Sequence, residues 1–353
     1  MAKTPRRSRS VSKRKASVIP AETTLKYTLP GDGTDVYIDI MRDLSAINRR
    51  GMNQGQVLHV AGITVKQDTG ATSEQSLQAT FKALPITWVA AQAYMKARMA
   101  WMEQQRRVRR DSGQEAIRPA YEDFKIFMDA GHRAWALERH ALDPSDPKYL
   151  PADEFSIKTL DGAGNAVVQG EWDYSRLVYA DHDYDPEVVR EPALHLVGAD
   201  ITTGSPAYPT DIGLIQAYEE SRATVDGDQP NVPVTAADNI YTWLTSSQDE
   251  AASSEIIENM INDNDSPPYS INNYAGGDSN YPTNVDKLYL QTNQSNQVVN
   301  AAGFPLLCGL LRIFSQGKNL VTGLDVTLPG TLLIHLAPGP KKGILSMNMG
   351  DLV

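Results

Sequence analysis

The sequence is poor in the features that define disulfide-rich, membrane-spanning and zinc-binding proteins. Its 353 residues contain one cysteine, Cys308, which excludes an intramolecular disulfide framework and a cysteine-based zinc site. The longest mostly apolar run, residues 301–311, is interrupted by two glycines and a proline, and it is far shorter than the ~20 residues of a membrane span. No apolar segment follows the charged N-terminus, so we expect neither a secretory signal nor a membrane partner.

Motifs for nucleotide binding and catalysis are also lacking. Gly162 and Gly164 are not followed by a third glycine at the dinucleotide-binding spacing, and Gly317-Lys318 lacks the first glycine of a P-loop. No serine occupies a G-x-S-x-G elbow. Cys308 lies in an apolar run, which predicts a core position in a strand rather than a nucleophile. We therefore expect that the protein is not an enzyme and needs no cofactor.

Positive charge is concentrated at the N-terminus. Residues 1–15 contain no acidic side chain and seven basic ones: Lys3, Arg6, Arg7, Arg9, Lys13, Arg14 and Lys15. The rest of the chain keeps 26 of the 33 basic residues against 43 acidic ones. Because residues 1–20 offer few apolar side chains to bury, they are expected to form a disordered basic arm on an acidic body.

Three functions suit such an arm. Lysine and arginine release counterions from phosphates, so the arm is expected to bind DNA or RNA without sequence preference. The basic run that includes residues 13–15 is also typical of a nuclear localisation signal, which a host importin would bind. The arm would otherwise serve only to keep the protein soluble.

A second basic group follows the clearest helical pattern. Apolar residues recur at three-and-four spacing after Pro85, which predicts a helix over residues 85–110 with the proline in its first turn. Five arginines lie within thirteen residues at its C-terminal end: Arg98, Arg106, Arg107, Arg109 and Arg110. Some of these cations stabilise the negative end of the helix dipole. The group exceeds that need, so Arg106, Arg107, Arg109 and Arg110 are candidates for a second polyanion contact or for a protein interface.

The remaining pattern is mainly that of β-structure. Alternating or short apolar runs predict about eight strands, at residues 36–41, 57–65, 154–160, 167–178, 193–197, 285–291, 304–314 and 331–336. Helices are expected at 121–140, broken near Gly131, and at 212–222. This order fits a β-sandwich or jelly roll over residues 21–353 with a helical insertion at about 85–140. Residues 226–284 are rich in Asp, Asn, Ser, Pro and Gly, and we expect them to be long surface loops.

Two smaller groups have alternative interpretations. Asp181, Asp183 and Asp185 alternate like calcium ligands, but prolines stand where an EF-hand needs its glycine and its closing glutamate. They form either a solvated acidic loop or a structural Ca²⁺ site between subunits. Trp172, Tyr174 and Tyr179 are either a sugar-binding face or core positions, and the sugar interpretation belongs to a non-viral carbohydrate-binding or nucleic-acid-binding β-sandwich.

Several segments resemble the capsid proteins of small circular Rep-encoding single-stranded DNA viruses (CRESS DNA viruses) of the uncultured environmental type. The similar segments are residues 88–101 (WVAAQAYMKARMAW), 121–127 (YEDFKIF), 170–175 (GEWDYS), 194–198 (LHLVG), 213–218 (GLIQAY), 221–222 (SR), 265–269 (DSPPY), 274–277 (YAGG) and 335–339 (HLAPG). They are spread over most of residues 80–340.

The resemblance implies a single jelly roll, a basic arm that faces the genome, and self-assembly into an icosahedral shell. With the simplest shell, of sixty copies (T=1), the partners would be other copies of the chain and a single-stranded DNA genome. The virion, and the host nucleus during assembly, would be its locations. A small positive-strand RNA virus could use the same arm, because phosphate contacts carry no base information.

Overall fold

The computed structural model describes residues 21–48, 50–67, 74–114, 116, 122–141, 172–181, 185–204, 208–223, 285–293 and 297–352. The basic arm, Asp183, the loops at 226–284 and the strand predicted at 154–160 lie outside these ranges. So does the first part of the strand predicted at 167–178. Within the described part of the chain the protein is mainly β, and its sheets are antiparallel except for one pair of strands in the insertion. None of the described helices is long and apolar enough to cross a membrane.

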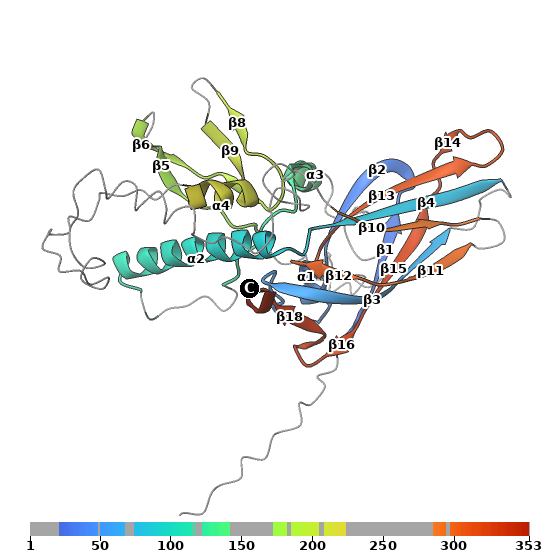
Figure 1. Cartoon of the computed structure of the whole chain (residues 1–353), viewed down its shortest axis with the longest axis horizontal. Coiled ribbons are helices and arrows are strands. Elements are labelled where there is room, and N and C mark those ends of the chain that lie inside the picture. Colours follow the sequence, from blue (N-terminus) through green and yellow to red (C-terminus); the bar gives the residue numbers. More distant parts are fainter. Residues whose placement is uncertain are drawn as a thin grey trace, which may run out of the picture.

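Two sheets that face each other form the larger part of the structure (Figure 1). The first has the order β1 (Thr24–Leu29), β15 (Gly330–Leu336), β3 (Gln56–Gln67) and β11 (Val298–Ala302), with β12 (Pro305–Leu307) and β18 (Ser346–Asn348) also paired to β3. The second has the order β10 (Val285–Gln291), β4 (Gln75–Ala83), β13 (Leu310–Asn319) and β14 (Asp325–Val326), with β2 (Asp32–Asp39) also paired to β13.

Strands that are far apart in the chain pair in a nested order. The strand β1 pairs with β15, β2 with β13, β3 with β11 and β4 with β10. Two further pairings, β15 with β3 and β13 with β4, complete the two sheets. These eight strands of the two sheets therefore form four nested antiparallel pairs.

The space between the sheets holds one continuous apolar core. Alternate residues of β1 and β15, such as Leu25, Leu29, Leu332 and Ile334, are completely buried, as the period of two in a strand requires. Burying each such side chain stabilises the fold by roughly 1.5–3 kcal/mol. The turn from β1 to β2 needs glycine, because Gly31 has a φ of +64° and a Cβ there would collide with the Leu328 carbonyl.

Two predicted strands have different ends in the structure. The strand predicted to reach Met41 stops at Asp39, and Ile40 begins helix α1 (Ile40–Asn48). The Asp39 side chain caps this helix, because its Oδ1 accepts a hydrogen bond from the Arg42 N–H at 3.1 Å. The strand predicted at 304–314 is two strands, and Cys308 lies in the turn between them with a φ of 57°. The prediction that Cys308 lies inside a strand was therefore wrong.

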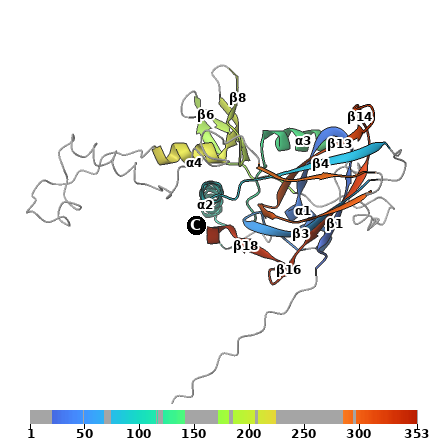
Figure 2. The same cartoon turned by 45° about the vertical axis from the view of Figure 1, so that its right-hand side comes forward.

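A large insertion separates β4 from β10 and lies at one end of the two sheets (Figures 1 and 2). Its helices are α2 (Trp88–Asp111), α3 (Ala130–Ala141) and α4 (Leu214–Ala223). Its strands are β5 (Tyr179–Asp181), β6 (Asp185–Arg190), β7 (Ala193–His195), β8 (Ile201–Thr203) and β9 (Tyr208–Gly213). The insertion is thus larger than the helical block predicted at 85–140. The predicted strand at 193–197 lies in it and not in the two large sheets.

The second predicted helix begins later than expected. Residues 122–129 are extended, and α3 starts at Ala130, so Gly131 lies in its first turn instead of breaking it. Phe124, Phe127 and Met128 have helical spacing in the sequence. Their side chains are buried, but the segment that carries them is not a helix. After β15 the chain forms β16 (Pro338–Gly339), β17 (Gly343–Ile344), β18 and the 3₁₀ turn η4 (Met349–Leu352), which contacts α2.

Candidate functional site

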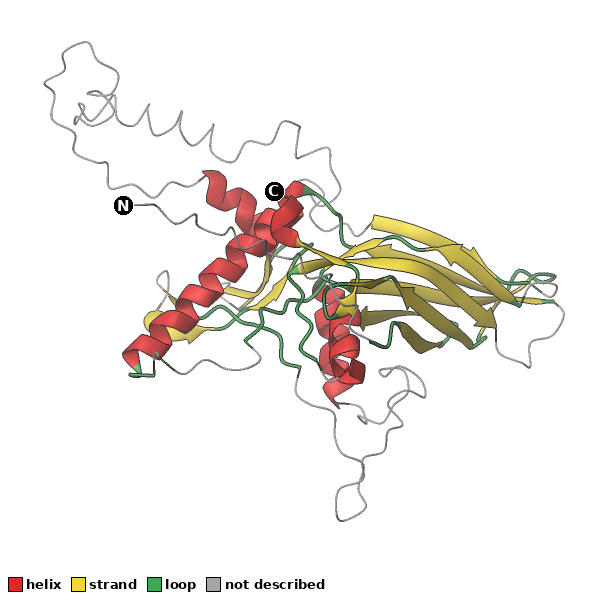
Figure 3. Ribbon diagram, turned by 90° about the horizontal axis from the view of Figure 1, so that it is seen from below, coloured by secondary structure: helices red, strands yellow, loops and turns green. Residues whose placement is uncertain are grey.

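Helix α2 carries its arginines away from the two sheets. Thr87 caps the helix by accepting a hydrogen bond from the Ala90 N–H at 3.2 Å, so Pro85 precedes the helix and does not lie in its first turn. The buried side chains of α2 lie between Val89 and Ala97, in its N-terminal half. Its 24 residues span about 36 Å. The C-terminal half therefore extends away from the two sheets, as Figure 3 shows.

The four candidate arginines at this end differ in their surroundings. Arg106 and Arg107 are about two-thirds exposed, and both reach Glu103, at 3.7 and 3.2 Å. Arg110 is exposed. Arg109 is only 19% exposed and pairs with Glu122 of the extended segment, so it fastens α2 to that segment. The structure therefore presents Arg106, Arg107 and Arg110 to solvent and assigns Arg109 a structural contact.

Most of the other predicted binding residues lie outside the part of the chain that the structure describes. All seven arm cations, Lys3, Arg6, Arg7, Arg9, Lys13, Arg14 and Lys15, and also Asp183, lie outside the described ranges. Asp181 and Asp185 are paired in the β5–β6 hairpin, and their side chains are not described. In the described part of the chain, no three His, Cys, Asp or Glu side chains meet as a metal site.

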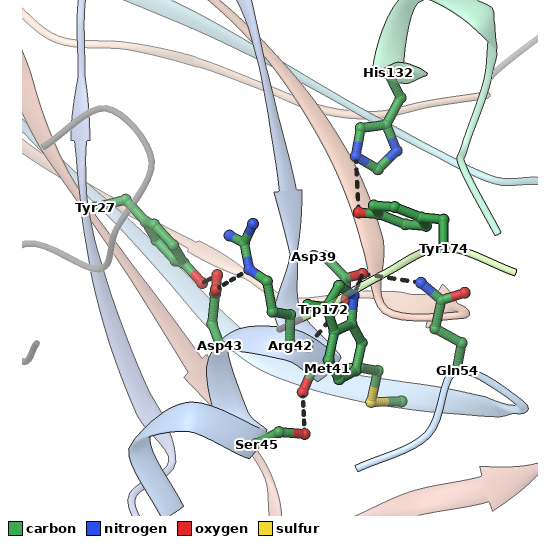
Figure 4. Close-up of polar contacts among 10 residues, drawn as sticks. All are labelled: Tyr27, Asp39, Met41, Arg42, Asp43, Ser45, Gln54, His132, Trp172 and Tyr174. Carbon is green, nitrogen blue, oxygen red and sulfur yellow. Dashed lines mark hydrogen bonds and ion pairs between the residues drawn. The ribbon is translucent and has the colours of Figure 1, made fainter. Parts of the chain in front are cut away.

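A buried polar network joins the sheets to the insertion (Figure 4). At its centre, Asp39 Oδ2 accepts hydrogen bonds from Gln54 Nε2 at 2.9 Å and from the indole N–H of Trp172 at 3.0 Å. Gln54 Oε1 accepts a further hydrogen bond from the Ile126 N–H at 2.7 Å. Burial raises the pKa of Asp39, and the Arg42 guanidinium opposes this rise. One carboxylate thus holds β2, the loop before β3 and two parts of the insertion.

A second carboxylate lies one helical turn away. Asp43 accepts hydrogen bonds from the Tyr27 hydroxyl and from Arg42 Nε, both at 2.8 Å. Burial and the Asp43 charge raise the pKa of Tyr27 well above its ordinary value, so its hydroxyl stays a donor. Figure 4 also shows His132 and Tyr174 at the edge of this network, where Tyr174 Oη lies 3.4 Å from His132 Nε2.

Sequence reasoning missed this network. The only local signal was a pair of acidic residues, Asp39 and Asp43, four positions apart beside a run of apolar residues. A buried pair of carboxylates can serve either as a structural tie or as an acid–base site. Here Asp39 accepts hydrogen bonds from Trp172 and Gln54, and Asp43 accepts them from Tyr27 and Arg42. These contacts favour a structural role for both carboxylates.

The cysteine is also placed in the interior. Cys308 is completely buried, and burial raises the pKa of its thiol well above the ordinary value. A thiol that stays protonated and out of contact with solvent is a poor nucleophile.

A cavity of about 650 Å³ opens between α3, the segment around Trp172 and the start of β7. Aromatic side chains and both signs of charge line it, including Phe127, Trp172, Tyr174, Arg133, Arg176 and Glu191. Tyr179, the third aromatic residue of the predicted sugar-binding face, is exposed in β5 and does not line this cavity.

Comparisons with known proteins give no relative: no family model, no curated protein and no solved structure matches this chain.

Proposed function

We propose that the chain is a viral coat-protein subunit that assembles into an icosahedral shell and packages single-stranded DNA. The main support is the strand order. Among the eight strands β1–β4, β10, β11, β13 and β15, counted along the chain, the first pairs with the eighth, the second with the seventh, the third with the sixth and the fourth with the fifth. This order supports a jelly roll, in which a two-stranded ribbon is wrapped into two facing sheets.

The insertion occupies the distal turn of this ribbon, between the fourth and fifth strands. A large insertion at that position can be accommodated at one end of the two sheets without disturbing the pairing of their strands. The sheets form the wall of the shell, and α2 with its exposed arginines extends beyond that wall.

Charge supplies the second support. The arm brings seven cations, and sixty arms would bring about 420 positive charges, enough for about 420 phosphates by one-to-one counterion replacement. Arg106, Arg107 and Arg110 add an exposed basic group at the end of α2. The remaining phosphates would be neutralised by polyamines or metal ions. The arm also serves as the nuclear localisation signal that a host importin binds. The subunits therefore assemble into virions in the nucleus.

The test compares the full chain with a variant that lacks residues 2–20. Purified full-length protein should form uniform spherical particles by negative-stain microscopy, and the particles should contain nucleic acid that survives external nuclease. The truncated variant should keep its thermal stability, because residues 2–20 offer few apolar side chains to the core. It should lose the packaged nucleic acid.

Salt dependence separates the arm from α2. With about seven phosphate contacts on a single strand, the logarithm of affinity should fall with the logarithm of salt concentration at a slope near −5. Three further contacts from Arg106, Arg107 and Arg110 would steepen the slope to about −7, and changing all three to Gln would return it to about −5. Arg109→Gln should mainly lower stability. A protein that stays monomeric at every ionic strength contradicts the shell. Protected RNA in place of DNA would instead indicate a positive-strand RNA virus.

A further inference from the structure

The cavity beside Trp172 has the size of a small-molecule site. Its volume of about 650 Å³ lies in the range of roughly 300–1,000 Å³ that such sites occupy. It is formed within the insertion, where α3, residues 172–176 and the start of β7 meet, and the arginines of α2 are not among its described lining residues.

The aromatic wall of the cavity is held in a fixed position. Tyr174 stacks on Phe127 with their ring centroids 3.9 Å apart and their planes at 25°. Trp172 is anchored by its hydrogen bond to Asp39. Both Trp172 and Tyr174 are only partly buried and line the cavity, and Lys125 Nζ lies over part of the Trp172 ring, 4.5 Å from its centroid. A ligand that packs against these rings does not have to pay for ordering them.

The charged groups of the cavity come in compensated pairs. Arg176 lies 3.4 Å from Glu191, and both side chains are more than half exposed. Arg133 forms an ion pair with Asp211. Asp173 is exposed at the same rim. These pairs place guanidinium donors beside carboxylate acceptors, so the described lining has no excess of positive charge.

This balance decides between two kinds of ligand. A phosphate or sulfate group gains most from uncompensated arginines, and both arginines of the described lining are paired with carboxylates. Neighbouring hydroxyl groups need an acceptor and a donor side by side, and Glu191 with Arg176 supplies both. The apolar face of a pyranose ring can at the same time pack against an aromatic ring.

From this geometry we propose that the cavity binds the neutral pyranose ring of a saccharide, with Trp172 and Tyr174 as the apolar platform and with Glu191, Arg176 and Asp173 as the hydroxyl-binding groups. The proposal does not depend on the coat-protein function.

The test uses saturation-transfer NMR on the full-length protein. The probes are the methyl glycosides of glucose, galactose, mannose and N-acetylglucosamine, each at a concentration up to about 10 mM, with dAMP as the charged nucleotide probe. At least one methyl glycoside should receive saturation, and Glu191→Gln and Asp173→Ala should each weaken its binding about tenfold. Glu103→Gln is the matched control, because Glu103 is also an exposed carboxylate paired with arginine but lies on α2, and it should leave binding unchanged.

Three results would overturn the proposal. The first is that no methyl glycoside receives saturation. The second is that saturation persists unchanged in both Glu191→Gln and Asp173→Ala while their thermal unfolding matches that of the native protein, which places the sugar elsewhere. The third is that dAMP binds more tightly than every glycoside and that Glu191→Gln strengthens its binding, which makes the cavity a nucleotide site.

Discussion

Trp172 donates its indole N–H to Asp39 Oδ2 across 133 positions of the chain, at 3.0 Å. Asp39 ends strand β2 of the sheets, whereas Trp172 belongs to the insertion. The same oxygen accepts from Gln54, which in turn binds Ile126. The orientation of the insertion on the sheets is therefore fixed by a buried carboxylate as well as by apolar packing.

The first prediction concerns this carboxylate. Asp39→Ala should lower the free energy of unfolding by about 3–5 kcal/mol, because it removes the acceptor of the Trp172 indole and of the Arg42 backbone N–H and one of the two acceptors of Gln54 Nε2. Asp39→Asn should cost less, because one acceptor oxygen remains. Denaturant titration of each variant gives these values.

Asp286→Ala is the control for Asp39→Ala. Its side chain is 70% exposed and pairs with Lys82 at 3.4 Å on the sheet surface, so the change should cost less than about 1 kcal/mol. If Asp39→Ala and Asp286→Ala have equal stabilities, the network does not hold the insertion in place.

The second prediction concerns Trp101. Helix α2 carries two tryptophans, Trp88 and Trp101. Both are only partly buried, and they have different neighbours: Trp88 lies 6.2 Å from the Tyr218 ring and Trp101 lies 5.9 Å from the Phe124 ring. Trp101→Ala should therefore cost about 2 kcal/mol, less than the ~3–5 kcal/mol of a fully buried tryptophan. Met102→Ala, at a neighbouring exposed position, should change stability by less than about 0.5 kcal/mol. A cost near zero for Trp101→Ala would show that its contact with Phe124 does not stabilise α2.

The long regular elements could be predicted from the sequence, because their pattern repeats over several turns or residue pairs. Strands β3 and β15 and helices α2 and α4 lie close to where periodicity predicts them. Strand β4 was missed although Leu77, Ala79, Phe81 and Ala83 alternate with polar residues and are all buried. The strand predicted from the alternating pattern extended beyond the end of β2, because an alternating pattern does not reveal that Asp39 caps a helix.

The remaining errors have a tertiary cause. Phe124, Phe127 and Met128 are spaced as on a helix, but each is buried against a different neighbour, such as Tyr94 for Phe124 and Tyr174 for Phe127. An extended segment can satisfy those contacts as well as a helix can. The network around Asp39 and the cavity beside Trp172 join residues from distant segments, so no local pattern announces them. The basic character of the α2 end, by contrast, was visible, but the contact that separates Arg109 from its neighbours was not.

The third prediction concerns the pH dependence of stability at Asp123. Burial raises the pKa of this carboxyl from 3.8 to about 6, Asp39 adds to the rise, and Lys125 opposes it. Within the described residues its Oδ2 has no hydrogen-bond partner. Because the folded pKa exceeds the unfolded one, the folded state binds more protons, and stability falls as the pH rises from about 4 to about 6. Asp123→Asn should therefore be more stable than the native protein at pH 8, and this advantage should shrink by about 1 kcal/mol at pH 5, after allowance for partial exposure.

Chemical denaturation of both proteins at pH 5 and pH 8 measures this difference. Other titrating groups affect the native protein and the variant alike, so only the difference between them reports on Asp123. An advantage for Asp123→Asn that is the same at both pH values would mean that this carboxyl does not titrate in this range.

The last prediction concerns an apolar tip between β13 and β14, and it rests on the proposed coat function. Leu320, Val321 and Leu324 are 51%, 71% and 67% exposed at the end of the sheets opposite α2 (Figure 1). The turn is held in shape by Asn319 Oδ1, which accepts hydrogen bonds from the Val321 and Thr322 N–H groups at 2.9 and 3.0 Å.

Exposed apolar groups on a fixed turn are typical of a surface that a partner covers, and in a shell that partner is a second copy of the chain. Val321→Glu should leave the thermal unfolding of the subunit nearly unchanged and should prevent particle formation, measured by sedimentation and negative-stain microscopy. Thr327→Glu adds the same charge to a nearby exposed position and should still assemble. Normal particles from Val321→Glu would show that the tip stays in solvent, and loss of assembly in Thr327→Glu as well would show that charge, rather than apolar contact, controls this end of the subunit.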